Sequence, residues 1–150
     1  MDPKLIYELE AFLFQLKSCL DILSQTLSIV YRLPSIVTYS NDGENIIKSL
    51  KQNTSQNLKD DALQIIKIIN DNKKWISDAI DMRDEVTHYS DLEGFSCFIN
   101  HTWFGQTTTK ISYPSLPDGN RASKYIQETW KHLLQFIKHM FNVMLQSILK

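Results

Sequence analysis

Arg83, Asp84 and His88 are the residues whose types and spacing best suit chemistry on an anionic group. A histidine can take or give a proton near neutral pH. An arginine can hold a phosphate and stabilise charge in a transition state. An aspartate can orient a histidine or keep it protonated. On a helix, Asp84 and His88 are four positions apart and share a face, so the three residues are the candidate catalytic group.

The helix expected over residues 73–89 breaks its own apolar pattern at Arg83. Its apolar residues fill one arc of the helical wheel, about 160° wide at 100° per residue, and Arg83 falls inside this arc. The arc is formed by Trp75, Ile76, Ala79, Ile80, Met82 and Val86. An arginine does not lose its proton, and leaving it buried and unpaired costs several kcal/mol. Arg83 must therefore meet a carboxylate, a cleft or an anionic ligand.

Two purely structural interpretations of these residues stay open. Arg83 could pair with Glu8, Glu10 or Asp21 of another helix and hold a bundle together. His88 could be a histidine at a helix C-terminus, where a positive charge is favourable.

The other elements that must position these residues are also helices. Leucine and other apolar residues recur every three or four positions over residues 3–32, and Pro34 ends that pattern. The remaining expected helices are a short one at 44–50, one at 58–70 and a last one from 121 nearly to 150. The sequence Asn70-Asp71-Asn72 predicts a break before the helix at 73–89. The pattern predicts one domain over residues 1–150, a mainly α bundle of four to five helices.

Residues 94–114 differ from the rest of the chain. Apolar and polar residues alternate there, and Gly105-Gln106 offers a turn, so we expect a β-hairpin. On the last helix, Ile126, Trp130, Leu133, Ile137, Met140, Met144 and Ile148 form the expected core stripe. Leu134, Phe141 and Leu145 widen it, so it can serve a core and a dimer interface together.

Composition and charge narrow the class of protein. The chain has 150 residues and a net charge of −1, with no apolar run near the roughly 18 residues of a membrane span. The start of the chain is unlike a signal peptide. Cys19 and Cys97 lack metal-ligand spacing, and we expect buried cytoplasmic thiols. We expect no membrane association, no metal and no cofactor.

The charge is uneven along the chain. Residues 1–109 carry 10 basic and 15 acidic side chains, whereas residues 110–150 carry six basic and two acidic ones. The last helix therefore has either a solvated basic face or one that attracts a phosphate backbone. We interpret His132 and His139 on this helix as surface or interface residues.

One stretch of the chain resembles the signature of the HEPN family. It reads Met82-Arg83-Asp84-Glu85-Val86-Thr87-His88-Tyr89, with four residues between the arginine and the histidine. The family has an arginine, a polar residue and a histidine after a spacer of four to six residues. The segment Phe14-Gln15-Leu16-Lys17-Ser18-Cys19-Leu20-Asp21 is similar to the first helix of some HEPN branches. The resemblance covers about residues 1–90 and the last helix, and the hairpin resembles an insertion of some members.

This resemblance implies a homodimer of helical bundles in which two copies of the motif face one cleft. It implies a metal-independent endoribonuclease, of the toxin or defence kind, with RNA as substrate and an antitoxin protein as a candidate partner. In such an enzyme the 2′-hydroxyl of RNA attacks the adjacent phosphorus. Lys17, Ser18, Asp21 and Tyr89 are the candidate supporting residues.

The sequence departs from some members of the family. Members paired with a nucleotidyltransferase have a tyrosine two residues after the histidine, where this chain has Ser90. Other members bind a nucleotide or another protein without catalysis, and this binding-module interpretation stays open. So does a helical bundle unrelated to the family.

Overall fold

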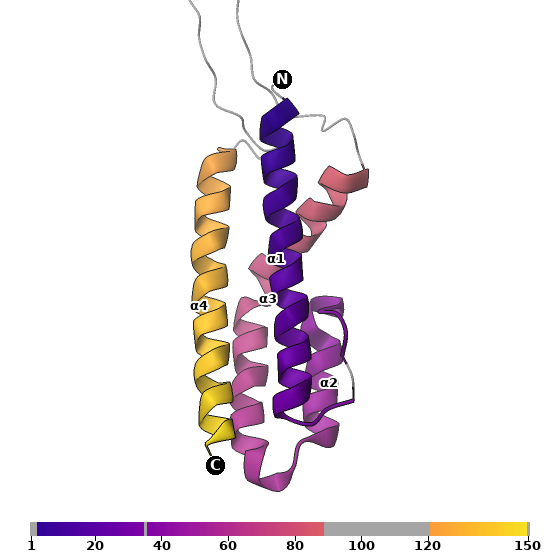
Figure 1. Cartoon of the computed structure of the whole chain (residues 1–150), viewed down its shortest axis with the longest axis vertical. Helices are drawn as coiled ribbons and strands as arrows, with labels where there is room; N and C mark the ends of the chain where they lie inside the picture. Colours follow the sequence, from indigo (N-terminus) through magenta and orange to yellow (C-terminus); the bar gives the residue numbers. More distant parts are fainter. Residues whose placement is uncertain (1–2, 35, 89–120, 150) are drawn as a thin grey trace, which may run out of the picture.

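The computed structural model describes residues 3–34, 36–88 and 121–149, which form a helical bundle without strands (Figure 1). The mainly α class expected from sequence is therefore confirmed, while the predicted hairpin at 94–114 lies outside the described residues. The helices are α1 (Pro3–Val30), α2 (Glu44–Asn53), α3 (Lys59–His88) and α4 (Ala122–Ile148), with short 3-10 turns η1 (Asn41–Gly43) and η2 (Gln56–Leu58).

Three long helices make the core, and α2 is an addition to it. α1 and α4 run in the same direction, α3 runs opposite to both and passes behind α1, and α2 packs on α3 (Figure 1). The main cluster of buried side chains includes Leu20, Leu27, Ile65, Ile76 and Phe136. A smaller cluster of Leu9, Leu13 and Ala122 closes the end of the bundle where α1 and α4 begin.

The C-terminus of α1 is made by a residue in the left-handed conformation. Arg32 has φ 53°, and the amide of Leu33 donates to the carbonyl of Ser28 at 2.9 Å. The amide of Arg32 donates to Ile29 at 3.3 Å, which completes a Schellman motif. The helix thus ends before Pro34, because the left-handed residue has already turned the chain.

The predicted break at Asn70-Asp71-Asn72 is wrong, because α3 is continuous from Lys59 to His88. The side chain of Asn72 does not cap a new helix. Its Nδ2 donates to the carbonyl of Ile68 at 2.8 Å, and its Oδ1 accepts from Trp75 Nε1 at 2.7 Å. Both bonds follow the helix surface, so a residue common at helix starts is accommodated inside one.

The core stripe expected on α4 is wrong at two positions. Trp130 and Ile148 are 48% and 64% exposed. The buried row of α4 instead comprises Ala122, Thr129, Leu133, Phe136, Met140, Val143, Met144 and Ser147. α4 therefore carries two apolar rows side by side, and the bundle buries one of them.

A buried polar network joins the three long helices at the end of the bundle where α1 and α4 finish. Ser147 Oγ donates to Asp61 Oδ2 at 3.0 Å, and the Tyr31 hydroxyl lies 2.9 Å from the same Ser147 Oγ. All three side chains are buried. Burial of these hydrogen-bonded polar groups fixes the axial register of the helices. If one helix slipped along its axis, a buried polar group would lose its partner.

Candidate functional site

The motif occupies the last turns of α3, at the end of the bundle where α1 begins. Arg83 and Asp84 are both partly buried, with 25% and 50% of their side chains exposed. His88 is the last residue of α3, and its side chain and Tyr89 lie outside what the structure describes.

Arg83 and Asp84 pair with each other. Arg83 Nε donates to Asp84 Oδ1 at 2.9 Å, and Arg83 Nη2 donates to the same oxygen. Because both groups are open to solvent, this pair contributes little stability. A phosphate could replace the carboxylate as the partner of the arginine at small cost, since guanidinium binds both in the same two-pronged way.

The structure does not favour the interpretation of Arg83 as an anchor to α1. Among the described residues, no ion pair joins Arg83 to Glu8, Glu10 or Asp21. The carboxylate of Asp21 is used elsewhere, because its Oδ1 pairs with Lys17 Nζ and also accepts the amide of Tyr39 at 2.7 Å.

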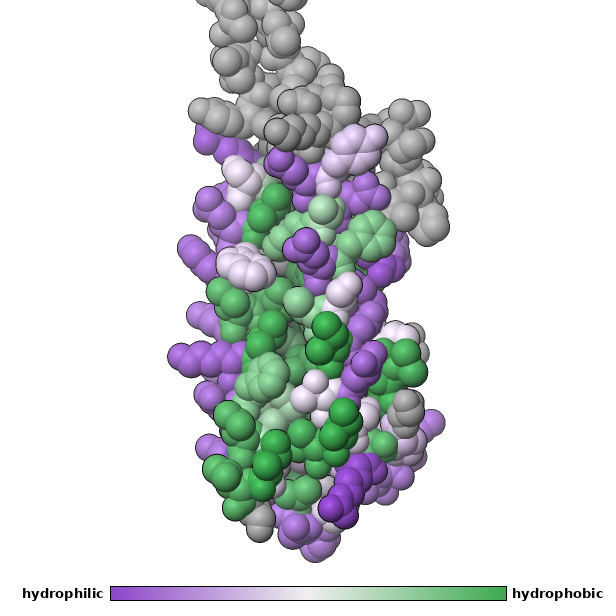
Figure 2. Space-filling view, in the orientation of Figure 1, coloured by the Kyte–Doolittle hydropathy of each residue, from purple (hydrophilic) through white to green (hydrophobic). Residues whose placement is uncertain are grey.

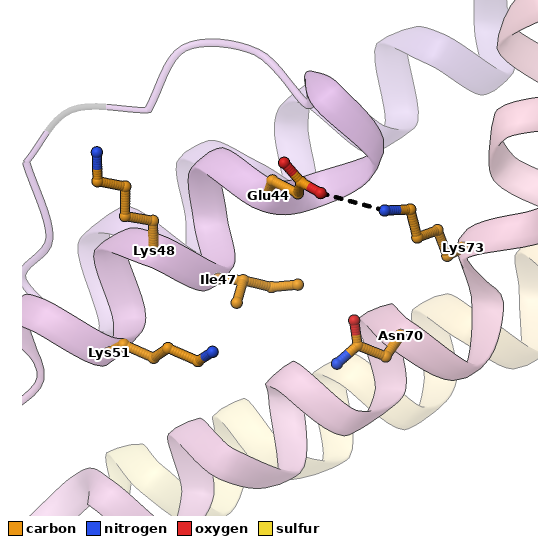
Figure 3. A pocket seen from close by; sticks show the side chains of 6 residues that line it. All are labelled: Glu44, Ile47, Lys48, Lys51, Asn70 and Lys73. Carbon is orange, nitrogen blue, oxygen red and sulfur yellow. Dashed lines mark hydrogen bonds and ion pairs between the residues drawn. The ribbon is translucent and has the colours of Figure 1, made fainter.

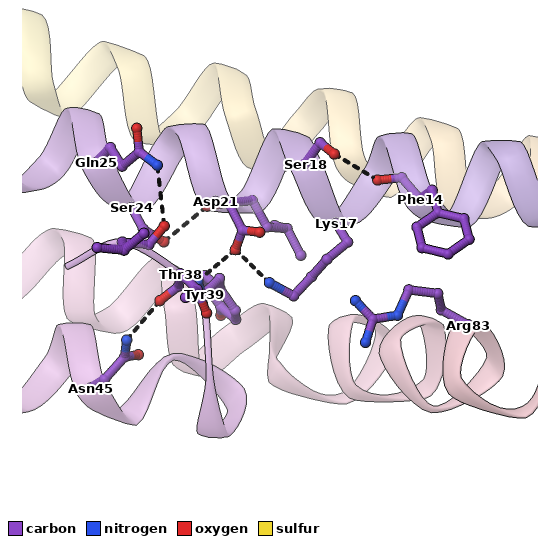
Figure 4. A network of polar contacts seen from close by, with 12 residues as sticks. Phe14, Lys17, Ser18, Asp21, Ser24, Gln25, Thr38, Tyr39, Asn45 and Arg83 are labelled. Carbon is purple, nitrogen blue, oxygen red and sulfur yellow. Dashed lines mark hydrogen bonds and ion pairs between the residues drawn. The ribbon is translucent and has the colours of Figure 1, made fainter. Parts of the chain in front are cut away.

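Lys17 is the candidate supporting residue that lies beside the motif. Its side chain extends from α1 into the gap between α1 and α3, and Arg83 reaches into the same gap from α3 (Figure 4). Only 14% of the Lys17 side chain is exposed, and Asp21 holds it in place. Two cations from two helices thus border one gap, each with a carboxylate on its own helix.

The described contacts of Ser18 and Asp21 are with residues other than Arg83 and Asp84. Ser18 Oγ donates to the carbonyl of Phe14 at 2.9 Å and points away from Arg83 (Figure 4). Asp21 positions Lys17 and the backbone of Tyr39. Both residues stay predictions as supporting residues of the site.

The histidines of α4 are not grouped with the motif. His132 and His139 are exposed, in agreement with a surface location, and the His132 ring lies 5.8 Å from the Trp75 ring. In the described part of the chain, no three His, Cys, Asp or Glu side chains are grouped as a metal site would require. No described helix is both long and apolar enough to cross a membrane.

Sequence reasoning missed a basic cleft between α2 and α3. Lys48, Lys51 and Lys73 line it together with Asn70 (Figure 3). The spacing of Lys48 and Lys51 places two cations on one side of α2, which was a signal available in the sequence. The third lysine comes from another helix and becomes a neighbour only when α2 folds back on α3.

Comparison of the chain with protein-family models, with curated proteins and with solved structures finds no match.

Proposed function

We propose that this chain is a HEPN-type endoribonuclease that acts as a homodimer and needs no metal ion. The observation that carries the proposal is the placement of Arg83. Its guanidinium is partly buried, borders the same gap as Lys17, and sits on the helix that His88 ends. Lys17 and Arg83 are two cations near the end of the helix that carries His88, and such a group of side chains suits the binding of a phosphodiester.

The chemistry proposed for the site is transfer of the phosphoryl group to the neighbouring 2′-oxygen. The 2′-oxygen forms a bond to phosphorus while the bond to the 5′-oxygen breaks, which leaves a cyclic phosphate and a 5′-hydroxyl. His88 takes the proton of the 2′-hydroxyl or gives one to the leaving oxygen. Arg83 leaves Asp84 to bind the phosphate and stabilises the charge that develops on it.

A second apolar surface supports the homodimer. The α1/α4 apolar face consists of Ile22, Ile29, Trp130, Leu134, Phe141, Leu145 and Ile148, which are between 44% and 78% exposed (Figure 2). At these exposures each side chain offers roughly 100 Å². Together they approach the roughly 800 Å² that each partner buries in a standard interface. We propose that a second copy of the chain covers this face.

The test of catalysis is cleavage of RNA pools by purified protein in EDTA. We expect cleavage by the natural sequence and loss of cleavage in Arg83→Ala and His88→Ala at matched dimer content. Lys67→Ala, an exposed lysine elsewhere on α3, is the control and should keep full activity. Cleavage that survives both motif substitutions would show that the motif is not the catalytic site.

The test of the dimer is Leu145→Glu combined with Ile29→Glu, which places charges on the α1/α4 apolar face. Sedimentation should report a monomer, whereas Gln146→Glu on the exposed side of α4 should leave the dimer intact. The monomeric variant should lose cleavage if each cleft needs both copies of Arg83 and His88. A monomer that cleaves RNA at the normal rate would rule out the composite cleft.

The Arg83–Asp84 pair also favours a second candidate function, a binding module without catalysis. A motif arginine already held by its neighbour can exchange that partner for the phosphate of a nucleotide without any reaction following. Nucleotide binding that depends on Arg83, together with no cleavage of any RNA pool, would establish this function. Growth arrest on expression that His88→Ala relieves would support the enzyme.

A further inference from the structure

The basic cleft between α2 and α3 has the size and lining of a ligand site. Its volume is about 440 Å³, and its walls are Glu44, Ile47, Lys48 and Lys51 of α2 with Asn70 and Lys73 of α3. Ile47 and Lys51 point into the gap between the two helices, toward Asn70 (Figure 3). An apolar floor, an amide and several cations are the groups that bind the sugar and phosphate of a nucleotide chain.

The positive charge of the cleft is only partly compensated. Lys73 Nζ pairs with Glu44 at 3.3 Å and with Asp42 at 3.5 Å. In the part of the chain that the structure describes, no carboxylate pairs with Lys48 or Lys51, and both side chains are exposed. These two lysines therefore present unpaired charge in a chain whose first 109 residues are acidic on balance.

The paired lysine shapes the cleft. The hydrogen bond to Glu44 raises the pKa of the Lys73 ammonium, and this ion pair joins α3 to the start of α2. Lys73 holds one wall in place. Lys51 points into the cleft, whereas Lys48 stands at its edge with its ammonium directed away from Asn70 (Figure 3).

The cleft lies on the same side of α3 as the acid of the motif. Lys73 and Asp84 are eleven residues apart on one continuous helix. Eleven residues are about three turns, which places the two residues about 20° apart around the axis and about 16 Å apart along it. A single strand that is at least as extended as a strand of B-form DNA advances about 3.4 Å or more per nucleotide. The separation therefore corresponds to at most about five nucleotides.

We propose that this cleft binds the phosphodiester backbone of a single-stranded RNA, up to about five nucleotides away from the phosphate held at Arg83. The proposal rests on the proposed function for the identity of the strand. Lys48 and Lys51 bind the phosphates of the strand. Asn70 hydrogen-bonds a polar group of the strand, and Ile47 contacts a ribose or base. The cleft thereby gives the enzyme affinity for a strand without reading its sequence.

The experiment measures binding and not cleavage, so that it does not depend on catalysis. The probe is a fluorescent 2′-O-methyl RNA of twelve nucleotides, which lacks the attacking hydroxyl. In Lys48→Gln/Lys51→Gln we expect affinity to fall about tenfold and the salt dependence to lose a slope of about 1.4, the value for two phosphate contacts of a single strand. The matched control is Lys131→Gln/Lys138→Gln, which removes the same charge from exposed positions of α4 and should keep the slope.

Varying the length of the probe distinguishes a cleft that binds part of a longer strand from a cleft that binds any small anion. A two-nucleotide probe should bind the Gln variant and the natural sequence equally, because it cannot span from Arg83 to the cleft. An equal loss in both double variants, the absence of binding by the natural sequence, or a loss that is the same for both probe lengths would overturn the proposal. Full competition by inorganic pyrophosphate at matched ionic strength would overturn it too.

These results also separate this proposal from the proposed function. Length-dependent binding through Lys48 and Lys51 in a protein that cleaves no RNA would support the RNA-binding role of the cleft and contradict the proposed endoribonuclease activity. Cleavage that depends on Arg83 and His88 without any effect of the two lysines would do the reverse.

Discussion

Arg83 Nε lies 2.9 Å from Asp84 Oδ1, so the arginine of the motif is neutralised by the residue that follows it. This pairing is a contact of Asp84 besides the one predicted with His88, whose side chain lies outside the described residues. In the absence of a ligand the carboxylate occupies the arginine, and an incoming phosphate must displace it. Under the proposed function, Asp84 therefore competes with the phosphate for Arg83.

Asp84→Asn should tighten the binding of a non-cleavable RNA probe several-fold. The substitution removes the anion that competes with phosphate for Arg83, and a partly exposed ion pair is worth up to about 1 kcal/mol. Fluorescence anisotropy at fixed salt measures the effect. Asp81→Asn removes the same charge from an exposed position one turn earlier and should change affinity less. Weaker binding in Asp84→Asn would show that the pair helps to position Arg83.

Ser147→Ala should lower the free energy of unfolding by about 2 kcal/mol. The buried carboxylate of Asp61 loses a donor, and the hydroxyl of Tyr31 loses its partner. Chemical denaturation measures the loss. Ser18→Ala removes a hydroxyl that bonds only to its own helix and should cost almost nothing. Equal stabilities of the two variants would show that the network does not hold the bundle.

Tyr39→Phe should raise the free energy of unfolding at pH 7 by about 1 kcal/mol. The Tyr39 side chain is 1% exposed, and its hydroxyl has no hydrogen-bond partner among the described residues. Removing a buried polar atom without a partner relieves its desolvation penalty. Urea denaturation at pH 7 measures the gain. A loss of stability would indicate that the hydroxyl has a partner in solution.

The same residue predicts alkaline unfolding. Burial, and then the charge of Asp42, raise the pKa of the Tyr39 hydroxyl. The folded protein therefore keeps the proton longer than the unfolded chain, in which tyrosine titrates near pH 10. The stability is fully present below about pH 10 and is lost as pH rises beyond it. Tyr39→Phe should lose less stability than the natural sequence between pH 10 and 11, whereas Tyr7→Phe, at an exposed position, should not differ.

Arg32→Gly should stabilise the protein by about 1 kcal/mol. Arg32 occupies the left-handed position that ends α1, and a side chain there costs roughly 1–2 kcal/mol that glycine avoids. Part of the gain is offset by the greater freedom of glycine in the unfolded chain. Thermal denaturation measures it. A lower melting temperature would show that the Arg32 side chain makes a stabilising contact.

Helix existence was predictable because apolar periodicity is a local property. The expected helix over 3–32 matches α1 within two residues. The short helix expected at 44–50 is present as the first part of α2. The break at Asn72 was not predictable in the same way. Asparagine bonds equally well to a backbone outside a helix or inside one, and the choice depends on the packing of α3 against its neighbours.

The two apolar rows of α4 show the same limit. Sequence shows that this helix is apolar over a wide arc, but it does not show which part of the arc faces the bundle. The structure buries Phe136 and leaves Phe141 44% exposed. The direction from which α1 and α3 approach decides between them.

The sequence by itself determined the helical class, the approximate bounds of α1 and α4 and the adjacency of Arg83 and Asp84, because these follow from local spacing along one helix. The tertiary structure alone decided that Lys17 borders the same gap as Arg83, that Lys73 joins Lys48 and Lys51 in one cleft, and which apolar row stays outside. Each of these relationships joins different helices, and the relative placement of helices is fixed by packing over the whole core.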